Sequence, residues 1–405
     1  NITDGIQTGH FTRVIRADDE QRGLLFAGTE SGIYLSQDDG QHWQSVQLNL
    51  PVVPITDLAL KQGNLIAATQ GRGYWILDDV SLLRQADESV FKQASHLFIP
   101  APAWRLRNGS REQPENMGSN PPAGVVVYYW LAEELAEDSG LSLEISDMDG
   151  KVIRTFTAKP PEGEEPDEPI LGDDDRKLDT GVGLNRFVWD MHYPSVEKFK
   201  GLVLWNRSLD GAKAIPGTYQ ATLKLGGKQQ SVNLEVRADP RLDISPETYR
   251  AQFEFVSGIN RKLNETHSAI TRLREAKSQL GAIEKRIEGD NGHAELIESA
   301  SGLQEKLGAI EATLYQTKME SPQDPLNFPI RLNDKLAGLM SLSALGTHPP
   351  TNAAIAVRDE LFEAIDSQLN RLESVLSEDL ADFNRQAAEV GLEAVRVTAF
   401  RDSES

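Results

Sequence analysis

Two stretches of this sequence carry the same succession of short apolar segments and turn residues. Residues 27–34 read AGTESGIY, and residues 68–75 read ATQGRGYW. They lie about 40 residues apart, the usual length of one four-stranded blade in a propeller repeat. Short strands separated by closely spaced turns are typical of such all-β folds. The sequence therefore predicts that residues 1–95 form small, similar sheets, the terminal blades of a β-propeller.

The first of these stretches runs into residues 36–43, SQDDGQHW, which match the Asp-box pattern at its four signature positions, Ser36, Asp38, Gly40 and Trp43. The Asp38 carboxylate can accept backbone N–H bonds across a tight hairpin, and Gly40 can take a positive φ. The Trp43 indole can fill the space between neighbouring strands. We therefore interpret the four residues as a folding device, with Asp38 in a structural role and not that of an acid catalyst.

Several segments resemble the end of the propeller in large bacterial BNR-repeat, sortilin-like proteins, many of which carry the label glycosyl hydrolase. They are residues 11–16, 27–43, 54–57, 68–79, 327–333 and 383–385. Gln70 departs from the pattern, since related sequences often have His there. We expect a periplasmic or secreted protein with a non-catalytic binding or scaffolding role that recognises a peptide or glycan. The alternative is an accessory C-terminal region of a sialidase-like glycoside hydrolase whose active site lies upstream.

A propeller ring needs about four to eight blades, whereas residues 1–95 supply about two. We therefore expect the chain to be the C-terminal part of a larger protein, with upstream blades or a partner chain completing the ring. The alternatives are packing of the open blade on this chain's own later domains, or on a second copy in a homo-oligomer. A sialidase-type site draws its residues from several blades, so we expect no catalytic residue here.

The middle of the chain changes character twice. Residues 96–123 are rich in proline and polar residues and are expected to form a linker, in which residues 97–99 form a strand bonded to an outer element of the propeller. A strand period of two then returns over residues 124–238. Residues 215–219, IPGTY, resemble a FlgD-type or fibronectin-type immunoglobulin-like domain, so we expect a β-sandwich of that class.

Three residues of the sandwich region are candidates for ligand binding. Trp189 with Asp190, and separately Trp205, have the chemistry to stack on a sugar face while a carboxylate accepts hydroxyl hydrogen bonds. Burial of both indoles in packing is the alternative, and the simpler one. The acidic residues between 172 and 179 offer oxygen ligands for a hard cation, although a solvated acidic loop explains them more simply.

Arg72 is a fourth candidate, because it lies in a turn between blade strands. A guanidinium there is suited to bind a carboxylate near the propeller axis. The alternative, and the favoured one, is a structural ion pair with Asp78 or Asp79.

Beyond residue 240 the apolar residues recur at helical spacing. Ser245 is placed to cap a helix that has Pro246 in its first turn. We expect a helical bundle over residues 245–391 and a tail over 392–405, with Gly391 as the C-terminal stop. The expected elements are a helix over 246–288, a turn over 289–292, a returning helix over 296–314, a crossover over 321–329, a short helix around 332–339 and a last long helix after 351. We expect their apolar seams to pack within the chain; binding of partner helices is the alternative.

The composition excludes several kinds of chemistry. The 62 Asp and Glu residues against 41 Lys and Arg give a net charge of -21, which repels nucleic acid and anionic lipid. The chain has no cysteine, so it has no disulfide, thiolate metal site or cysteine nucleophile. Its 7 histidines show no metal-ligand spacing, and hydrolase, kinase and metalloprotease signatures are missing. We therefore predict no metal, no cofactor, no nucleic-acid partner and no membrane span, and the first residues do not read as a signal peptide.

Overall fold

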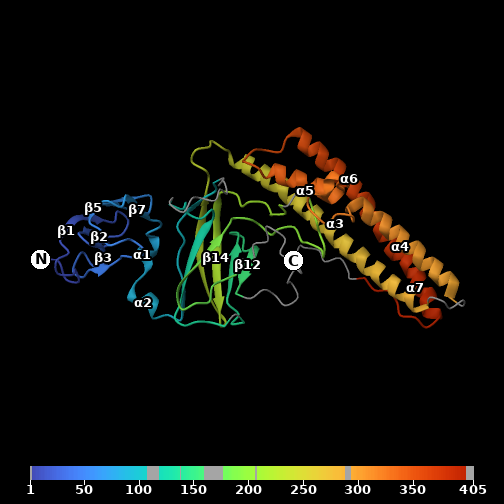
Figure 1. The fold of residues 1–405 in the computed structure, drawn as a ribbon, viewed down its shortest axis with the longest axis horizontal. Helices are drawn as coiled ribbons and strands as arrows, with labels where there is room; N and C mark the ends of the chain where they lie inside the picture. The colour runs from blue at the N-terminus through green and yellow to red at the C-terminus, as the bar shows by residue number, and fades with distance from the viewer. Residues whose placement is uncertain are drawn as a thin grey trace. The chain divides into compact units, whose positions relative to one another are not determined.

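The computed structural model describes residues 2–106, 118–136, 138–158, 177–205, 208–287 and 293–397. The chain divides into two compact units, one formed by Asn1–Lys159, Lys177–Asp190 and Gly217–Asp239, the other by Pro160–Arg176, Met191–Pro216 and Pro240–Ser405. Small sheets make up the first unit and long helices dominate the second (Figure 1). The acidic residues 172–176 and the predicted turn at 289–292 lie outside the described residues.

Two small antiparallel sheets form the N-terminal part of the first unit, as the repeat predicted. The first sheet has the order β1-β2-β3-β4, with β1 Thr12–Ala17, β2 Leu25–Thr29, β3 Gly32–Ser36 and β4 Gln44–Ser45. The second has the order β5-β6-β7, with β5 Ile55–Lys61, β6 Asn64–Thr69 and β7 Tyr74–Leu77. Their facing sides share one hydrophobic core, formed by Leu24, Phe26, Ile33 and Leu35 from the first sheet and Ile55, Leu58, Leu65 and Ala67 from the second.

Two short helices follow the second sheet, α1 Ser81–Gln85 and α2 Glu88–Phe91. Arg84 links α1 to the first sheet. Its guanidinium bonds the buried carboxylate of Asp18 at 2.9 Å and the exposed carboxylate of Glu20 at 2.5 Å. Gln37 of the Asp-box turn donates to the carbonyls of Leu83 at 2.9 Å and Ala86 at 2.8 Å, at the end of α1. The first sheet therefore holds α1 through contacts distant in sequence.

Two further sheets complete the first unit. One has the order β13-β10-β8, with β8 Ser95–Leu97, β10 Val125–Leu131 and β13 Gly183–Trp189. The other has the order β12-β11-β14-β15-β9, with β9 Ala103–Trp104, β11 Ser142–Ser146, β12 Val152–Thr157, β14 Gly217–Leu225 and β15 Lys228–Arg237. The prediction for residues 97–99 was wrong in its partner: Leu97 pairs with Tyr129 of β10, and the Phe98 amide donates to the Tyr128 carbonyl at 3.1 Å.

The second unit is a bundle of long helices. Its elements are α3 Pro246–Ile287, α4 Ala294–Leu314, the short 3₁₀ turn η2 Asp324–Leu326, α5 Leu332–Ser343, α6 Asn352–Ser374, the π-turn η3 Val375–Asp379 and α7 Leu380–Glu389. The apolar seams pack together in one core, as predicted for an intramolecular bundle. Ser245 caps α3 by accepting the Thr248 amide at 3.3 Å. Gly391, with φ +76°, ends α7 in a Schellman turn, in which the Leu392 amide reaches the Ala387 carbonyl at 2.9 Å.

The last predicted helix runs without a break from Asn352 to Glu389, and the π-turn η3 lies inside it. Ile365 and Leu372 are seven residues apart and both fully buried, but the next buried residue of that row is Leu380, eight residues on. One extra residue in the repeat would rotate the apolar stripe away from the core. The wider π-turn absorbs it, so that Leu380 and Phe383 return to the interior.

Residues 191–216 connect β13 to β14 but belong to the helical unit, although they lie within the range predicted for the sandwich. Val196, Phe199, Leu202 and Leu209 enter the helical core. Helix side chains also bind the backbone of this segment: His267 Nδ1 donates to the Glu197 carbonyl at 2.6 Å, Arg274 to the Lys200 carbonyl at 2.8 Å, and Asp334 accepts the Trp205 amide at 2.8 Å. The strand pattern gave no sign of this excursion.

Candidate functional site

The Asp-box residues form a compact turn between β3 and β4. Ser36 Oγ donates to Asp38 Oδ1 at 2.8 Å and accepts the Gly40 amide at 2.9 Å. Asp38 Oδ1 accepts the His42 amide at 2.9 Å, and its Oδ2 lies 2.6 Å from His42 Nδ1. These contacts with the His42 amide and ring lower the pKa of Asp38 to about 2. The Asp38 carboxylate therefore accepts its hydrogen bonds from residues of its own turn.

Trp43 and the N-terminal residues cover the outer face of the first sheet. The Trp43 side chain is buried with Ala27 and Tyr34, and Ile6 packs against this cluster. The Trp43 indole Nε1 donates to the Ile2 carbonyl at 2.8 Å, and the Trp43 amide donates to the Asp4 carbonyl at 2.8 Å. Both faces of the first sheet are thus occupied, one by the second sheet and the other by residues 2–10.

Strand pairing makes the two small sheets equivalent position by position. Each first strand has an irregularity opposite the end of its second strand, between Thr12 and Val14 in β1 and between Ile55 and Asp57 in β5. Aligning these irregularities and the strand pairs equates the following residues: Gly28 with Ala68, Phe26 with Ile66, Ala27 with Ala67, Ile33 with Tyr74, Tyr34 with Trp75 and Leu35 with Ile76.

Equivalent positions differ sharply in burial. Ile33 and Leu35 are 6% and 4% exposed beneath the second sheet, whereas Tyr74 and Ile76 are 80% and 58% exposed. The far face of the second sheet carries Ala59, Ile66, Ala68, Tyr74 and Ile76, whose strand pairs set them side by side. This set is the open face. Two of its members, Ala68 and Tyr74, lie in residues 68–75, the repeat that the sequence aligns. The sequence did not predict which residues of the sheet would be exposed.

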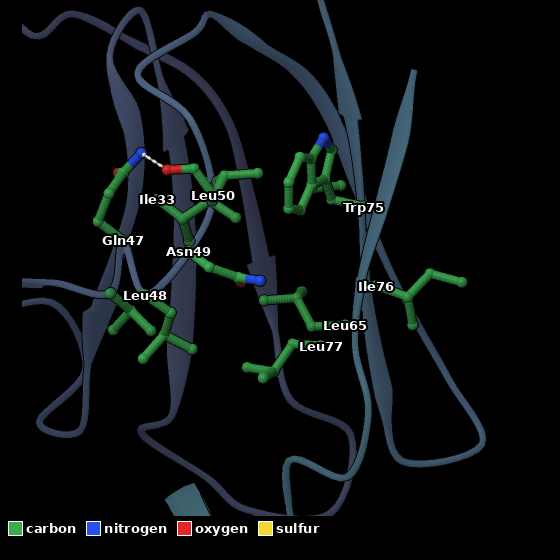
Figure 2. Close-up of a pocket in the computed structure, with 11 residues that line it drawn as sticks. Ile33, Gln47, Leu48, Asn49, Leu50, Leu65, Trp75, Ile76 and Leu77 are labelled. Carbon is green, nitrogen blue, oxygen red and sulfur yellow. Dashed lines mark hydrogen bonds between the residues drawn. The ribbon is translucent and has the colours of Figure 1, made fainter. Parts of the chain in front are cut away.

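A shallow groove opens on the inner side of β7, between the two sheets. It is lined mainly by apolar side chains, including Ile33, Leu50, Leu65, Trp75 and Leu77. Figure 2 shows Trp75, Leu65 and Leu77 turned toward Ile33 and Leu50, whereas Ile76 points away from the groove. Gln47 closes one side by donating to the Leu50 carbonyl at 2.7 Å. The groove thus flanks the same strand as the open face.

The outer edge of β7 lacks the fourth strand that the first sheet has. In the first sheet β4 pairs with β3, and the Val46 amide extends this pairing to the Ile33 carbonyl at 2.9 Å. Within the described part of the chain, no strand pairs with the corresponding edge of β7. The Thr69 amide donates to the Gly73 carbonyl at 3.1 Å, so these two residues form a hydrogen-bonded pair. Along an antiparallel ladder such pairs alternate with pairs that are not hydrogen-bonded, and Tyr74 and Ile76 belong to the second kind. The backbone groups of Tyr74 and Ile76 therefore point away from β6, toward the open edge.

The sugar-binding candidates are not assembled into a site. Trp189 is 0% exposed and packs edge-on against Tyr219, with ring centroids 5.4 Å apart, so its faces are closed to a sugar and the packing interpretation holds. Asp190, beside it, is half-buried. Trp205 belongs to the other compact unit and is 58% exposed, so it is not a core residue of that unit.

Arg72 is exposed in the turn before β7. The predicted ion pair with Asp78 or Asp79 is wrong, because no carboxylate of the described residues pairs with its guanidinium. Its carbonyl instead accepts the Trp75 indole N–H at 3.1 Å, which helps to fix the turn. Arg72 and Asp78 therefore stand as separate charges at the two ends of β7.

No group of acidic and histidine side chains suited to a metal occurs among the described residues. In the same part of the chain, every helix is too short or too polar to traverse a lipid bilayer.

Comparisons with known proteins name no family. No protein-family model matches the chain, and no curated protein matches it. A solved structure described as the extracellular domain of a hybrid two-component system from B. thetaiotaomicron aligns with 59% of this chain at 11% identity and a TM-score of 0.16. The chain spans only 27% of that structure's length. A TM-score this low carries no inference about fold or function.

Proposed function

We propose that this chain is a non-catalytic binding and scaffolding part of an exported β-propeller protein, in which the sheets β1–β4 and β5–β7 are consecutive blades. The β8–β15 sheets would form an immunoglobulin-like sandwich behind them, and the helical bundle a rigid stalk. The assembled propeller would recognise a peptide or glycan. The Asp-box turn and the resemblance to BNR-repeat, sortilin-like proteins support this assignment.

The observation that carries the proposal is the mismatch in burial between equivalent residues. Phe26, Ile33 and Leu35 are buried because the second sheet covers them. Their equivalents Ile66, Tyr74 and Ile76 form the open face, where apolar side chains of a repeat unit meet solvent. An exposed apolar sheet face is unfavourable for an isolated domain and typical of a surface that a further unit covers. A third blade stacked on the second sheet, as the second is on the first, would bury it.

Extending the repeat by one unit tests the blade assignment. Since Leu35 is equivalent to Ile76, a second copy of residues 36–76 inserted between Ile76 and Leu77 adds one complete period, including an Asp-box turn. We expect the added sheet to cover the open face, so that hydrogen exchange at Tyr74 and Ile76 slows. The matched control inserts the same residues in scrambled order. Unchanged exchange at β7, with an unstructured insert, would contradict the blade assignment.

The non-catalytic part of the proposal has a separate test. The 405-residue chain is incubated with fluorogenic sialosides and other aryl glycosides, with Asp38→Asn as the matched variant. We expect no turnover by either protein, because the Asp38 carboxylate is engaged by Ser36 and His42 in its turn. Hydrolysis by the unmodified chain that Asp38→Asn abolishes would overturn both the non-catalytic role and the structural interpretation of the Asp-box.

A further inference from the structure

The outer edge of β7 lies beside the open face. Tyr74 and Ile76 direct their backbone N–H and C=O groups outward, and nothing within the described residues pairs with them. The apolar groove lined by Trp75 and Leu77 flanks this edge on one side, and the exposed side chains of Tyr74 and Ile76 flank it on the other. Unpaired edge groups between two apolar surfaces are what an added strand needs.

The first sheet shows what occupies this position. There β4 pairs with β3, with Gln44 opposite Leu35 and Ser45 opposite Tyr34. The Val46 amide continues the ladder to the Ile33 carbonyl, and the Val46 side chain packs into the core between the sheets. Ile33 and Leu35 are equivalent to Tyr74 and Ile76. The same backbone groups are therefore used in the first sheet, and in the second they have no partner among the described residues.

The charges at the two ends of β7 define the polarity of the occupant. Arg72 precedes the strand without an ion-pair partner among the described residues, and the exposed Asp78 follows it. A segment running antiparallel to β7 meets Asp78 with its N-terminal end and Arg72 with its C-terminal end. Opposite charges across a strand pair are favourable, and like charges are unfavourable.

We propose that β7 binds an extended segment of a partner polypeptide as an antiparallel fourth strand, basic at its N-terminal end and acidic at its C-terminal end. Apolar residues of that segment lie opposite Tyr74 and Ile76, as Val46 lies opposite Ile33 in the first sheet. An apolar residue between them, opposite Trp75, enters the groove. This inference rests on the proposed blade repeat, because the first sheet supplies its template.

A designed heptapeptide tests the site on the full chain. The probe is acetyl-Lys-Thr-Val-Leu-Val-Thr-Glu-amide, and its matched control exchanges the terminal Lys and Glu. We expect saturable binding of the probe, slowed hydrogen exchange over residues 72–78, and about tenfold weaker binding of the control, because two favourable charge pairs become unfavourable. Methylation of the peptide nitrogens that face β7 abolishes binding if the contact is a strand ladder.

Two variants separate the edge from the face. Ile76→Pro removes an outward-pointing N–H and leaves the bonds to β6 in place, so we expect loss of probe binding with the strand retained. Arg72→Glu leaves the backbone untouched and is expected to reverse the preference at the C-terminal end, favouring a peptide with Lys in place of Glu. Probe binding that is insensitive to both variants overturns the proposal.

The remaining outcomes also decide the question. No binding of either peptide, with exchange at 72–78 unchanged, overturns strand addition. Dimerisation of the chain that Ile76→Pro abolishes assigns the edge to a second copy and overturns the partner segment. If Ile66→Asp, on the open face, abolishes binding while Ile76→Pro does not, the face is the docking surface; the blade proposal then stands and the inference about the edge fails.

Discussion

The two small sheets have the same strand geometry and opposite environments. In the first sheet, residues 2–10 cover one face and the second sheet covers the other, so Phe26, Ile33 and Leu35 are buried. In the second sheet the equivalent residues Tyr74 and Ile76 are largely exposed. The pattern of apolar residues therefore specifies each small sheet, whereas the neighbour decides whether its second face is buried. Substitutions at equivalent positions measure that difference directly.

The largest expected contrast is between Phe26→Ala and Ile66→Ala. Phe26 is 0% exposed in the core between the sheets, so its truncation should destabilise the first sheet by about 3–5 kcal/mol. Ile66 is half-buried on the open face, and its truncation should cost about 1 kcal/mol. Native-state hydrogen exchange of the β2 and β6 amides measures both values within one protein. Equal losses would mean that Ile66 is covered and that the contrast between the sheets is false.

Acid should destabilise the helical unit more than the two small sheets. His267 in α3 is buried, which lowers its pKa to about 4 even though its bond to the Glu197 carbonyl opposes the shift. The unfolded chain takes up this proton near the ordinary pKa of 6.5, and the folded chain only near 4. The contribution of neutral His267 to the free energy of unfolding is therefore complete above pH 6.5 and declines by about 3 kcal/mol as the pH falls to 4.

The measurement is the exchange of α3 amides as a function of pH in the wild type and in His267→Asn, which keeps a donor near the Nδ1 position. We expect the variant to lose this part of the pH dependence while β2 and β6 respond identically in both proteins. A decline of the same size in the variant would assign the acid sensitivity to other groups.

A smaller contrast concerns Gly28, which packs against Ile55 of the second sheet. A Cβ placed on Gly28 would meet Ile55 Cγ2 at 2.6 Å and Val14 Cγ1 at 2.7 Å. Gly28→Ala should therefore destabilise the first sheet by about 1–3 kcal/mol, and adding Ile55→Leu, which removes the Cγ2 branch, should recover part of the loss. The equivalent change in the second sheet, Ala68→Gly, should cost about 1 kcal/mol or less through backbone entropy. Urea denaturation followed by exchange at β2 and β6 compares the pair. Absence of recovery with Ile55→Leu would place the strain elsewhere.

The sequence was informative wherever a pattern is local. Strand alternation and turn residues located the small sheets, and the spacing of Leu263, Ile270 and Leu280 located the seam of α3, all three being fully buried. The capping residues Ser245 and Gly391 act as predicted, because a cap depends only on neighbours within one turn.

The failures share a dependence on distant partners. Alternation revealed that residues near 97 form a strand but not that β10 is its partner. Trp189 and Trp205 are the same residue type in similar apolar surroundings of the sequence, yet one is 0% exposed and the other 58%. The π-turn was visible in principle, since Leu380 follows Leu372 by eight residues instead of seven. The open edge of β7 required knowing the strand pairs.

The smallest expected effect distinguishes the sheets by their turns, since only the first has the Asp-box. Hydrogen bonds from the His42 amide and ring lower the pKa of Asp38 to about 2, below the ordinary 3.8. As the pH falls, the unfolded chain therefore gains this proton first. The stabilisation from Asp38 is present above pH 3.8 and lost as the pH falls toward 2.

His42 sets the limit at higher pH. The bond to Asp38 raises the pKa of His42, so the stabilisation from His42 is present below pH 6.5 and lost as the pH rises through the raised value. The exchange of β3 amides should thus be slowest between these limits, and Asp38→Asn should flatten the profile at both ends. The β6 amides, whose sheet has no such turn, should be unaffected by the substitution; an equal change there would show that Asp38 acts beyond its own hairpin.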